Sequence, residues 1–270
     1  MANMLAPVSV IIPCFCCAGT VERAVSSVQA QSRRPAELIL IDDASIDDTW
    51  NVLERLAASH PGWIKLAKFS CNQGAANARN AGWDMASEPF IAFLDADDSW
   101  HSEKIEIQHM YMERNPGVAI SGHAYLWSGE WRKKPEASLE YSVKPIGKTS
   151  LLYKSAFSTP AVMLRRELPF RFLANQRYAE DAYLWQQIAF AGYSMVRLEI
   201  PLVTLHKAPY GEGGLSAHIW RGEYAELKNY IRLYQSGRIN TTNLFGASLF
   251  SMLKFLKRCA RVYIQKLIKH

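Results

Sequence analysis

The sequence predicts an α/β fold, in which a mostly parallel sheet is flanked by helices and followed by a C-terminal helical extension. Short apolar runs alternate with amphipathic helical patterns over residues 1–100. This alternation is typical of βαβ units that build a parallel sheet. The residues from 228 onward hold nine Lys or Arg and no Asp or Glu, which separates them from the body.

The first half is expected to hold four strands and three helices. Apolar runs predict strands at 8–13, 38–41, 64–69 and 90–94. Thr20 and the polar residues 45–48 can cap the first two helices, and Gly82 is expected to end the third. Ligands of such sheets bind beyond the carboxyl ends of the strands. The polar groups that follow the four strands should therefore meet at one edge; they lie at 14–17, 42–43, 72–73 and 95–98.

The second half has a less regular pattern. We expect helices at 102–115 and 179–191, strands at 118–126, 159–164 and 201–206, and a loop-rich stretch at 127–150. The boundaries that follow are 1–215 for the main domain, with halves at 1–100 and 101–215, and 216–270 for the helical extension.

Composition excludes several classes of protein. The chain has 270 residues, 49% of them hydrophobic and 21% charged, which is unlike a disordered chain. No apolar run is long enough for a membrane-spanning helix, and residues 1–6 lead directly into a strand, so we expect no secretory signal. Five cysteines, three of them at 14, 16 and 17, favour a reducing compartment. They are expected to fill the core, with a zinc site as the alternative.

The net charge of +6 is unevenly distributed. Outside the basic tail the chain carries 22 basic and 25 acidic residues, so the body is mildly acidic. A nucleic-acid enzyme more often spreads basic residues along its working cleft. We therefore expect no nucleic-acid partner.

Asp95, Asp97 and Asp98 form the sharpest chemical feature. Three carboxylates within four residues repel one another unless a cation is bound, and Mg²⁺ or Mn²⁺ with a diphosphate would satisfy them. The alternative is that Asp97 and Asp98 cap the next helix. Asp42 and Asp43 follow an earlier strand and are compatible either with binding a base or ribose or with capping a helix.

Some motifs are absent from the sequence. There is no G-x-G-x-x-G after the first strand, no G-x-x-x-x-G-K-[ST] and no G-x-S-x-G. These absences argue against a dinucleotide cofactor, P-loop chemistry and a serine hydrolase. They favour a nucleotide diphosphate that is held through a metal ion rather than through a glycine-rich loop.

Six segments occur together in an order that resembles the family 2 glycosyltransferases, which have a GT-A fold. They are VSVIIP at 8–13, SSVQAQ at 26–31, LILIDDAS at 38–45, NQGAANARN at 72–80, FLDADD at 93–98 and the pair Glu180-Asp181. The resemblance covers about residues 7–208. It implies that 1–215 is a GT-A catalytic domain with a nucleotide-binding half and an acceptor half. It also implies sugar transfer from a nucleotide diphosphate, usually with inversion, as in O-antigen or exopolysaccharide synthesis.

The resemblance assigns donor-binding roles to residues of the first half. Pro13 and Phe15 would line the base pocket, although the family usually has Tyr where Phe15 stands. Asp43 would hydrogen-bond the base, and Arg79 would lie near the base or the diphosphate. Asp95 and Asp97 would form the DXD motif, with Asp97 directed toward the ribose or the metal.

The resemblance also implies the metal and catalytic groups. Mn²⁺ or Mg²⁺ would be held by Asp97 and Asp98. Independently of the resemblance, His206 ends the last predicted strand and could complete the metal shell or contact the diphosphate, with a purely structural role as its alternative. Asp181, paired with Glu180 at a helix start, would be the general base that deprotonates the acceptor hydroxyl. Its position beside other carboxylates is expected to raise its pKa.

The basic tail predicts an amphipathic helix. Its apolar stripe consists of Leu249, Met252, Leu253, Leu256, Ala260, Tyr263, Ile264 and Leu267. Such a helix suits an anionic membrane surface, and the alternative is packing on the body with a solvated basic face. We expect a protein that is cytoplasmic and peripheral at the inner face of the cell membrane.

The function that the sequence favours is a metal-dependent inverting glycosyltransferase with a UDP-sugar donor and a lipid-linked saccharide acceptor. A polyprenyl-phosphate glycosyltransferase, a nucleotidyltransferase and a non-catalytic saccharide-binding module are the alternatives. Two weaker features are Trp127 and Trp131, which suit either sugar stacking or a hairpin core, and the loop Gly211–Gly214, which suits either closure over the donor or an ordinary turn.

Overall fold

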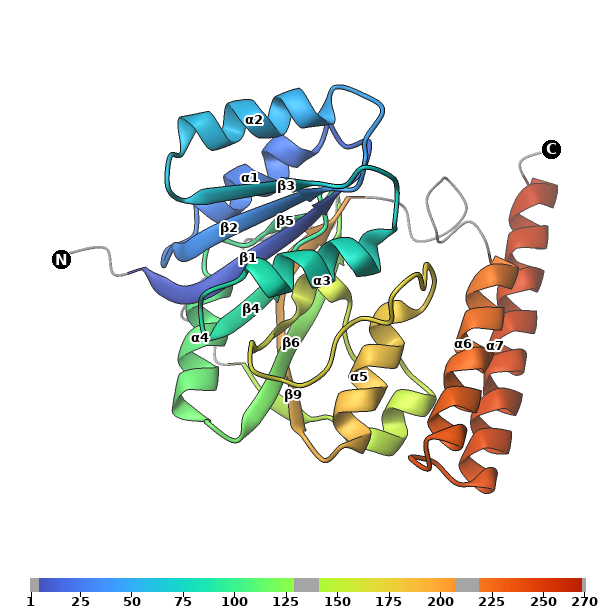
Figure 1. Ribbon diagram of the computed structural model, residues 1–270. Helices are drawn as coiled ribbons and strands as arrows, with labels where there is room; N and C mark the ends of the chain where they lie inside the picture. Colours follow the sequence, from blue (N-terminus) through green and yellow to red (C-terminus); the bar gives the residue numbers. More distant parts are fainter. Residues whose placement is uncertain (1–4, 129–140, 207–218, 269–270) are drawn as a thin grey trace.

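The computed structural model describes residues 5–128, 141–206 and 219–268. Figure 1 shows a twisted central sheet with helices on both faces and a pair of long C-terminal helices standing beside it. The described strands form one sheet in the order β3-β2-β1-β4-β8-β6-β9-β5, and β7 pairs with β9.

The first half is a parallel sheet, as predicted. Its elements are β1 (Ala6–Cys14), α1 (Val21–Gln29), β2 (Pro35–Asp42), α2 (Thr49–Ser59), β3 (Ile64–Lys68), α3 (Ala75–Met85) and β4 (Phe90–Phe93). β1 pairs in parallel with β2 and with β4, and β2 pairs in parallel with β3. All four carboxyl ends therefore point to the same edge.

The second half of the sheet is mixed, with antiparallel strands added to the predicted parallel half. Its elements are β5 (Ser99–Trp100), α4 (Lys104–Arg114), β6 (Val118–Trp127), β7 (Val143–Pro145), two 3₁₀ turns (Lys148–Leu152 and Thr159–Ala161), β8 (Met163–Arg165), α5 (Glu180–Phe190) and β9 (Ser194–Leu205). β8 runs antiparallel to both β4 and β6, and β5 and β7 run antiparallel to β9. Among the described strands of this half, β6 and β9 form the one parallel pair.

Two apolar layers cover the two faces of the sheet. Alternate residues of β1 divide between them, with Val8, Val10 and Ile12 on one face and Ile11 on the other. Side chains of α1, α2 and α4 pack on the first face, and those of α3 and α5 pack on the second. The period of two along a strand explains this division.

Gly82 does not end its helix as predicted, because α3 continues to Met85. A Cβ at position 82 would lie 2.5 Å from Cγ2 of Ile11. Glycine is therefore needed here for the close approach of α3 to β1, rather than for a left-handed helix end. This contact sets the position of α3, which carries Arg79.

Two predicted strands have different bounds in the structure. The segment expected to be a strand at 159–164 begins with the turn Thr159–Ala161, where Pro160 occupies the start of the turn, and only Met163–Arg165 is strand. The last strand begins seven residues earlier than predicted, at Ser194. Its polar residues Arg197 and Glu199 concealed the strand pattern in the sequence.

Gly122 on β6 allows an aromatic ring to pack directly on the sheet. A Cβ there would lie 2.0 Å from Cδ1 of Phe157. Phe157 is buried, and it leads into the turn that begins at Thr159. The contact therefore fixes the chain just before a residue that belongs to the candidate site.

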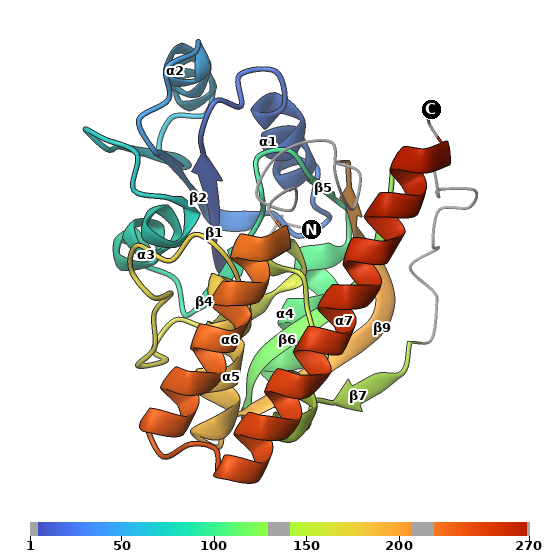
Figure 2. The ribbon, with the colours of Figure 1, turned by 90° about the vertical axis from the view of Figure 1, so that its right-hand side faces the viewer.

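The C-terminal extension consists of two helices that lie side by side, α6 (Ile219–Gln235) and α7 (Thr241–Ile268) (Figure 2). Tyr230 of α6 contacts the carbonyl of Leu152 at 2.9 Å, which ties the pair to the body. Lys254 and Arg258 of α7 pair with Glu226 and Glu223 of α6, at 3.0 and 2.7 Å. No helix among the described residues is long and apolar enough to cross a membrane.

The apolar stripe of the tail faces outward over its described part. Leu249, Met252, Leu253 and Leu256 are all exposed, whereas Lys254 and Arg258 turn inward. These stripe residues therefore do not pack on the body, although α7 itself does contact it through Ala247 and Phe250. Contact of the stripe with a membrane stays a prediction. The side chains of Tyr263, Ile264 and Leu267 lie outside the described residues.

Candidate active site

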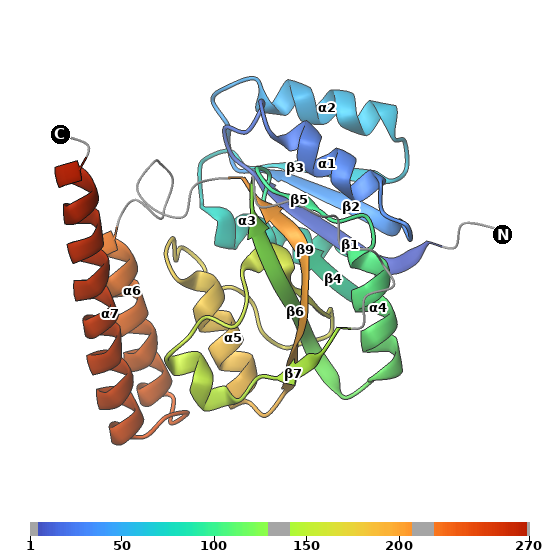
Figure 3. The same ribbon diagram turned by 180° about the vertical axis from the view of Figure 1, so that it is seen from behind.

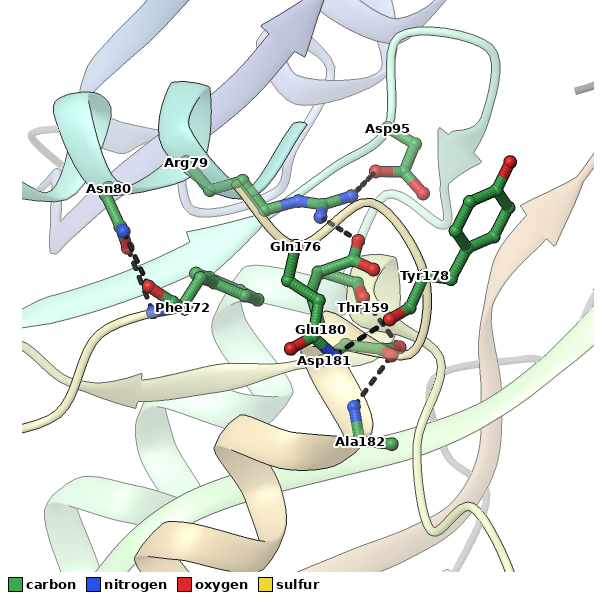
Figure 4. A network of polar contacts seen from close by, with 10 residues as sticks. All are labelled: Arg79, Asn80, Asp95, Thr159, Phe172, Gln176, Tyr178, Glu180, Asp181 and Ala182. Carbon is green, nitrogen blue, oxygen red and sulfur yellow. Dashed lines mark hydrogen bonds and ion pairs between the residues drawn. The ribbon is translucent and has the colours of Figure 1, made fainter. Parts of the chain in front are cut away.

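A buried arginine joins the two halves of the sheet. Arg79 projects from α3 and donates to Oδ1 of Asp95 at 2.8 Å and to Oε1 of Glu180 at 3.1 Å (Figure 4). Burial alone would lower the pKa of Arg79, but the carboxylates of Asp95 and Glu180 reverse this and raise it. The guanidinium is therefore a permanent cation between the acidic loop after β4 and the first residue of α5.

Glu180 and Asp181 begin α5, where the partial positive charge of a helix N-terminus favours carboxylates. Glu180 is buried, and this burial, together with the negative charge of Asp181, raises the pKa of Glu180 to about 7. Asp181 is less buried, and its Oδ2 accepts a hydrogen bond from Oγ1 of Thr159 at 3.1 Å. The two neighbouring acids thus differ in role: Glu180 pairs with Arg79, whereas the Thr159 hydroxyl orients Asp181.

Asp43 organises the loop that leads into α3. Its carboxylate accepts hydrogen bonds from the backbone N–H groups of Gln73 and Gly74, at 2.6 and 2.7 Å, and from the Asn72 side chain at 2.9 Å. These contacts fix the start of the helix that carries Arg79. Recognition of the base by Asp43 stays a prediction.

Two further residues predicted to bind the donor lie at the end of β1. Pro13 pairs with Ile41 in the β1–β2 register, and Phe15 follows the strand with 49% of its surface exposed. Both are thus at the same sheet edge as Asp43. Their contact with a base stays a prediction.

The acidic loop after β4 is held from several sides. Arg23 donates to the backbone carbonyl of Asp97, and Oδ1 of the buried Asp98 accepts from the backbone N–H of His206 at 3.1 Å. Capping of the next helix by Asp97 and Asp98 is wrong, because β5 intervenes and α4 begins only after Glu103. The loop instead follows β4 and is hydrogen-bonded to His206, the residue directly after β9.

His206 is suitable as a neutral metal ligand. Its burial, together with the charge of Arg23, lowers its pKa against the opposing effect of Asp97, so the imidazole is neutral near pH 7. One ring nitrogen contacts Oγ of Ser99 at 2.8 Å. Among the described residues no group of three or more His, Cys, Asp or Glu side chains is arranged to hold a metal ion. Mg²⁺, however, is usually held by one or two carboxylates plus substrate phosphates, and the carboxylates of the loop after β4 would fit this pattern.

Three residues of the site were missed in the sequence. Thr159 contacts Asp181, Arg23 holds the Asp97 backbone, and Arg177 donates to Oδ1 of Asn72 at 2.6 Å. No motif marks them, because each acts through a contact between distant segments. Trp127 stacks edge-on with Tyr125, whereas Trp131 and Gly211–Gly214 lie outside the described residues.

Comparison with known sequences places this geometry in context. Residues 9–173 match the family described as Glycosyl transferase family 2. The chain is 39% identical over 106 residues to the Escherichia coli UDP-Glc:alpha-D-GlcNAc-diphosphoundecaprenol beta-1,3-glucosyltransferase WfaP, covering 39% of this chain and 41% of WfaP. It is 33% identical over 184 residues to WfgD of Escherichia coli, which carries the same description as WfaP. This match covers 67% of this chain and 69% of WfgD. The chain thus spans less than half the length of the first of these relatives.

Solved structures share the fold. Residues 1–349 of TarS from S. aureus, in complex with UDP-GlcNAc, align with a TM-score of 0.65 and 17% identity, over 84% of this chain and 66% of that one. The mannosyltransferase PcManGT from Pyrobaculum calidifontis, in complex with GDP-Man and Mn²⁺, aligns with a TM-score of 0.67 and 19% identity. The alignment covers 95% of this chain and 76% of PcManGT. These likenesses confirm the expected GT-A fold.

The raised pKa of Glu180 predicts an unusual dependence of stability on pH. Because the pKa of about 7 lies above the ordinary value of 4.5, the folded state retains a proton that the unfolded state has released between these two values. The free energy of unfolding of the unmodified protein should therefore fall as the pH rises from 4.5 to 7. Glu180→Gln has no such titration. The free energy of unfolding of the variant minus that of the unmodified protein should therefore increase by about 1–3 kcal/mol as the pH rises from 4.5 to 7. Urea unfolding at several pH values measures this.

Glu54→Gln is the matched control, because Glu54 is exposed on α2. Its unfolding curves should run parallel to those of the unmodified protein at every pH. A Glu180→Gln variant whose relative stability did not change between pH 4.5 and pH 7 would contradict the raised pKa.

Proposed function

The chain belongs to glycosyl transferase family 2, and on this premise we propose that it transfers a sugar from a nucleotide-diphosphate donor, with a UDP-sugar as the expected donor, to a lipid-linked saccharide in cell-surface polysaccharide synthesis. The observation that carries the proposal is the Asp95–Arg79–Glu180 network. It joins the acidic loop of the nucleotide-binding half, residues 1–100, to the start of α5 in the acceptor half, residues 101–215. A donor at the first and an acceptor at the second would thus lie next to each other.

Asp181 is the group that we assign to proton transfer. It would accept the proton of the acceptor hydroxyl while that oxygen attacks the anomeric carbon, and the bond from this carbon to the diphosphate oxygen would break on the opposite side. Attack from the opposite side inverts the anomeric configuration. The Thr159 hydroxyl would orient Asp181, and Glu180 would be a positioning residue that keeps Arg79 in place.

A divalent cation, Mn²⁺ or Mg²⁺, would offset negative charge on the leaving diphosphate when bound. Asp97 would supply a carboxylate oxygen and His206 a neutral imidazole nitrogen, and the backbone contact of Asp98 with His206 ties the two segments together. Asp98 accepts a hydrogen bond from the backbone N–H of His206 and would thereby position His206. Its carboxylate would also ligate the metal directly.

Pro13, Phe15 and Asp43 are proposed to form the base subsite. Their support is their common place at the edge where the parallel strands end. Arg79, whose charge is already shared by Asp95 and Glu180, would act near the diphosphate by holding Asp95.

The exposed apolar face of α7 is proposed to rest on the anionic inner surface of the cell membrane. An aqueous setting leaves Phe245, Leu249, Leu253 and Leu256 unburied, although burial of each would be favourable. Two relatives carry names that specify a diphosphoundecaprenol acceptor. A lipid-linked acceptor of this kind would place the working enzyme at a membrane, in agreement with the exposed face.

The identity of the donor and the need for a metal can be tested together. In a panel of UDP-, GDP- and dTDP-sugars with Mn²⁺ or Mg²⁺, we expect turnover of a UDP-sugar and its loss in EDTA, because the cation would offset charge on the departing diphosphate. Release of the nucleoside diphosphate is the measurement. Donor turnover that is unchanged by EDTA would contradict the role of the metal. If none of the nucleotide sugars is turned over, the assignment as an enzyme is contradicted and a saccharide-binding module is favoured.

The second prediction concerns the base. Asp181→Asn should lower the rate of transfer about 10²–10⁴-fold, since asparagine cannot take the acceptor proton. Affinity for UDP should stay the same. Asp84→Asn is the matched control, because Asp84 is exposed on α3, where it pairs with Arg171. Full activity of Asp181→Asn would favour a polyprenyl-phosphate acceptor, which needs no general base.

The third prediction concerns the membrane. Substitution of Leu249, Leu253 and Leu256 together by Ser should reduce co-sedimentation with phosphatidylglycerol-containing vesicles at least about tenfold, because each removes apolar surface from the contact. Ile46→Ser is the control, since Ile46 is 92% exposed and lies far from α7 in the sequence. Unchanged partition would contradict the proposal. So would a stable dimer that the triple variant dissociates, because a second copy would then cover this face.

A further inference from the structure

A cavity of about 430 Å³ lies between the loop before α5 and one side of α6, from Trp220 to Arg232. The loop contributes residues 173–178, and Tyr178 precedes Asp181 by three residues. Figure 4 shows Gln176 and Tyr178 on this loop, beside the pair Glu180 and Asp181. Figure 3 shows α6 standing next to α5 from the opposite side of the molecule. The cavity therefore adjoins the proposed base but is formed by other residues than the donor site.

The charged residues that line the cavity are all cations. They are Arg177, Arg221, Lys228 and Arg232, and the described lining contains no Asp or Glu. The acids of α6 lie on another side of the helix, where Glu223 and Glu226 pair with Arg258 and Lys254 of α7. Helix α6 thus separates its charges, and among the described residues no carboxylate compensates the cations that line the cavity. Such a site favours a ligand with several negative charges.

Two of these cations are held in place by neutral partners. Nη1 of Arg232 donates to the side-chain oxygens of Gln176 and Asn229, at 2.8 and 3.2 Å. Arg177 donates to Asn72, which in turn contacts Asp43 on the donor side. Neutral partners orient the guanidinium groups without cancelling their charge. Both cations are therefore prepared for an anion, and guanidinium groups bind phosphate oxygens in pairs.

Aromatic side chains complete the lining. Trp220 and Tyr224 of α6 are 73% and 65% exposed, and Trp220 packs against Phe255 of α7 with ring centroids 4.4 Å apart. The aromatic wall is thus continuous with α7, on which Leu249, Leu253 and Leu256 are exposed. An amphiphile could place its anionic group among the cations and its apolar chain against this surface.

We propose that this cavity binds the diphosphate group of a lipid-linked acceptor, with the lipid chain leaving past Trp220 and Tyr224 toward α7. The inference rests on the proposed function, because it names the part of the acceptor that α6 recognises. The diphosphate would fix the attached saccharide near Asp181, three residues from the lining residue Tyr178. The acceptor would then be selected by its diphosphate as well as by its sugar.

Isothermal titration calorimetry of the full chain tests this proposal. The probes are inorganic pyrophosphate and decyl diphosphate, the latter below its critical micelle concentration, both in EDTA so that no metal bridges the ligand. We expect both to bind, and decyl diphosphate to bind at least about tenfold more tightly because its chain contacts the aromatic wall. Equal affinity for the two probes would assign the cavity to a free anion and overturn the lipid part. Binding of neither would overturn the whole proposal.

Variants locate the binding. Arg221→Ala and Lys228→Ala should each weaken both probes about tenfold, because each removes a charge-assisted contact from an exposed position. Lys228→Arg should retain affinity. Lys257→Ala is the matched control, since Lys257 is exposed on α7 and does not line the cavity, and its affinities should be those of the unmodified protein. Unfolding temperatures identify any variant that is misfolded, and equal weakening by Lys257→Ala would overturn the location.

A donor-site variant separates this proposal from the proposed function. Asp97→Asn should bind decyl diphosphate like the unmodified protein, because Asp97 is not in the cavity. If the probes bind but no nucleotide sugar is turned over, the proposed function fails and the cavity stands. If a nucleotide sugar is turned over but neither probe binds, the cavity fails and the glycosyltransferase stands.

Discussion

The ion pairs of Arg79 with Asp95 and Glu180 are the constraint on which the site depends. A buried guanidinium that lost the carboxylate of Asp95 would leave an uncompensated charge, which costs several kcal/mol. The three residues come from α3, from the loop after β4 and from the start of α5. Each of these segments must therefore be placed correctly before the network can form. The network couples correct folding of the sheet to assembly of the site.

The position of Arg79 is determined by contacts at both ends of its helix. Asp43 binds the backbone at the start of α3, and Gly82 allows the helix to approach Ile11 of β1. A carboxylate at the end of β2 and a missing side chain in α3 thus act together, although they lie about forty residues apart in the sequence. This gives Asp43 a structural function beside any role in binding a base, and it explains why the acid is buried.

The sequence was sufficient to predict the parallel half and to single out Asp95 and Glu180, which the structure joins through Arg79, because strand patterns and carboxylates are local signals. It was insufficient where tertiary contacts decide. Gly82 has the sequence signature of a helix end but is a close-packing position, and β9 has polar residues that hide its length. The raised pKa at Glu180 depends on burial, which sequence spacing does not contain. Thr159 and Arg177 act across more than twenty residues of sequence, so no motif could mark them.

The surplus of positive charge in the tail has a structural explanation that total charge conceals. Lys254 and Arg258 neutralise the acids of α6, and this pairing turns the opposite, apolar side of α7 toward the solvent. The same pairing leaves Lys228 and Arg232 without acidic competitors on the cavity side of α6. One arrangement of ion pairs between two helices thus produces both an apolar surface and a cationic cavity. An amphiphilic ligand needs both of these, and they are linked because the acids of α6 are engaged by α7.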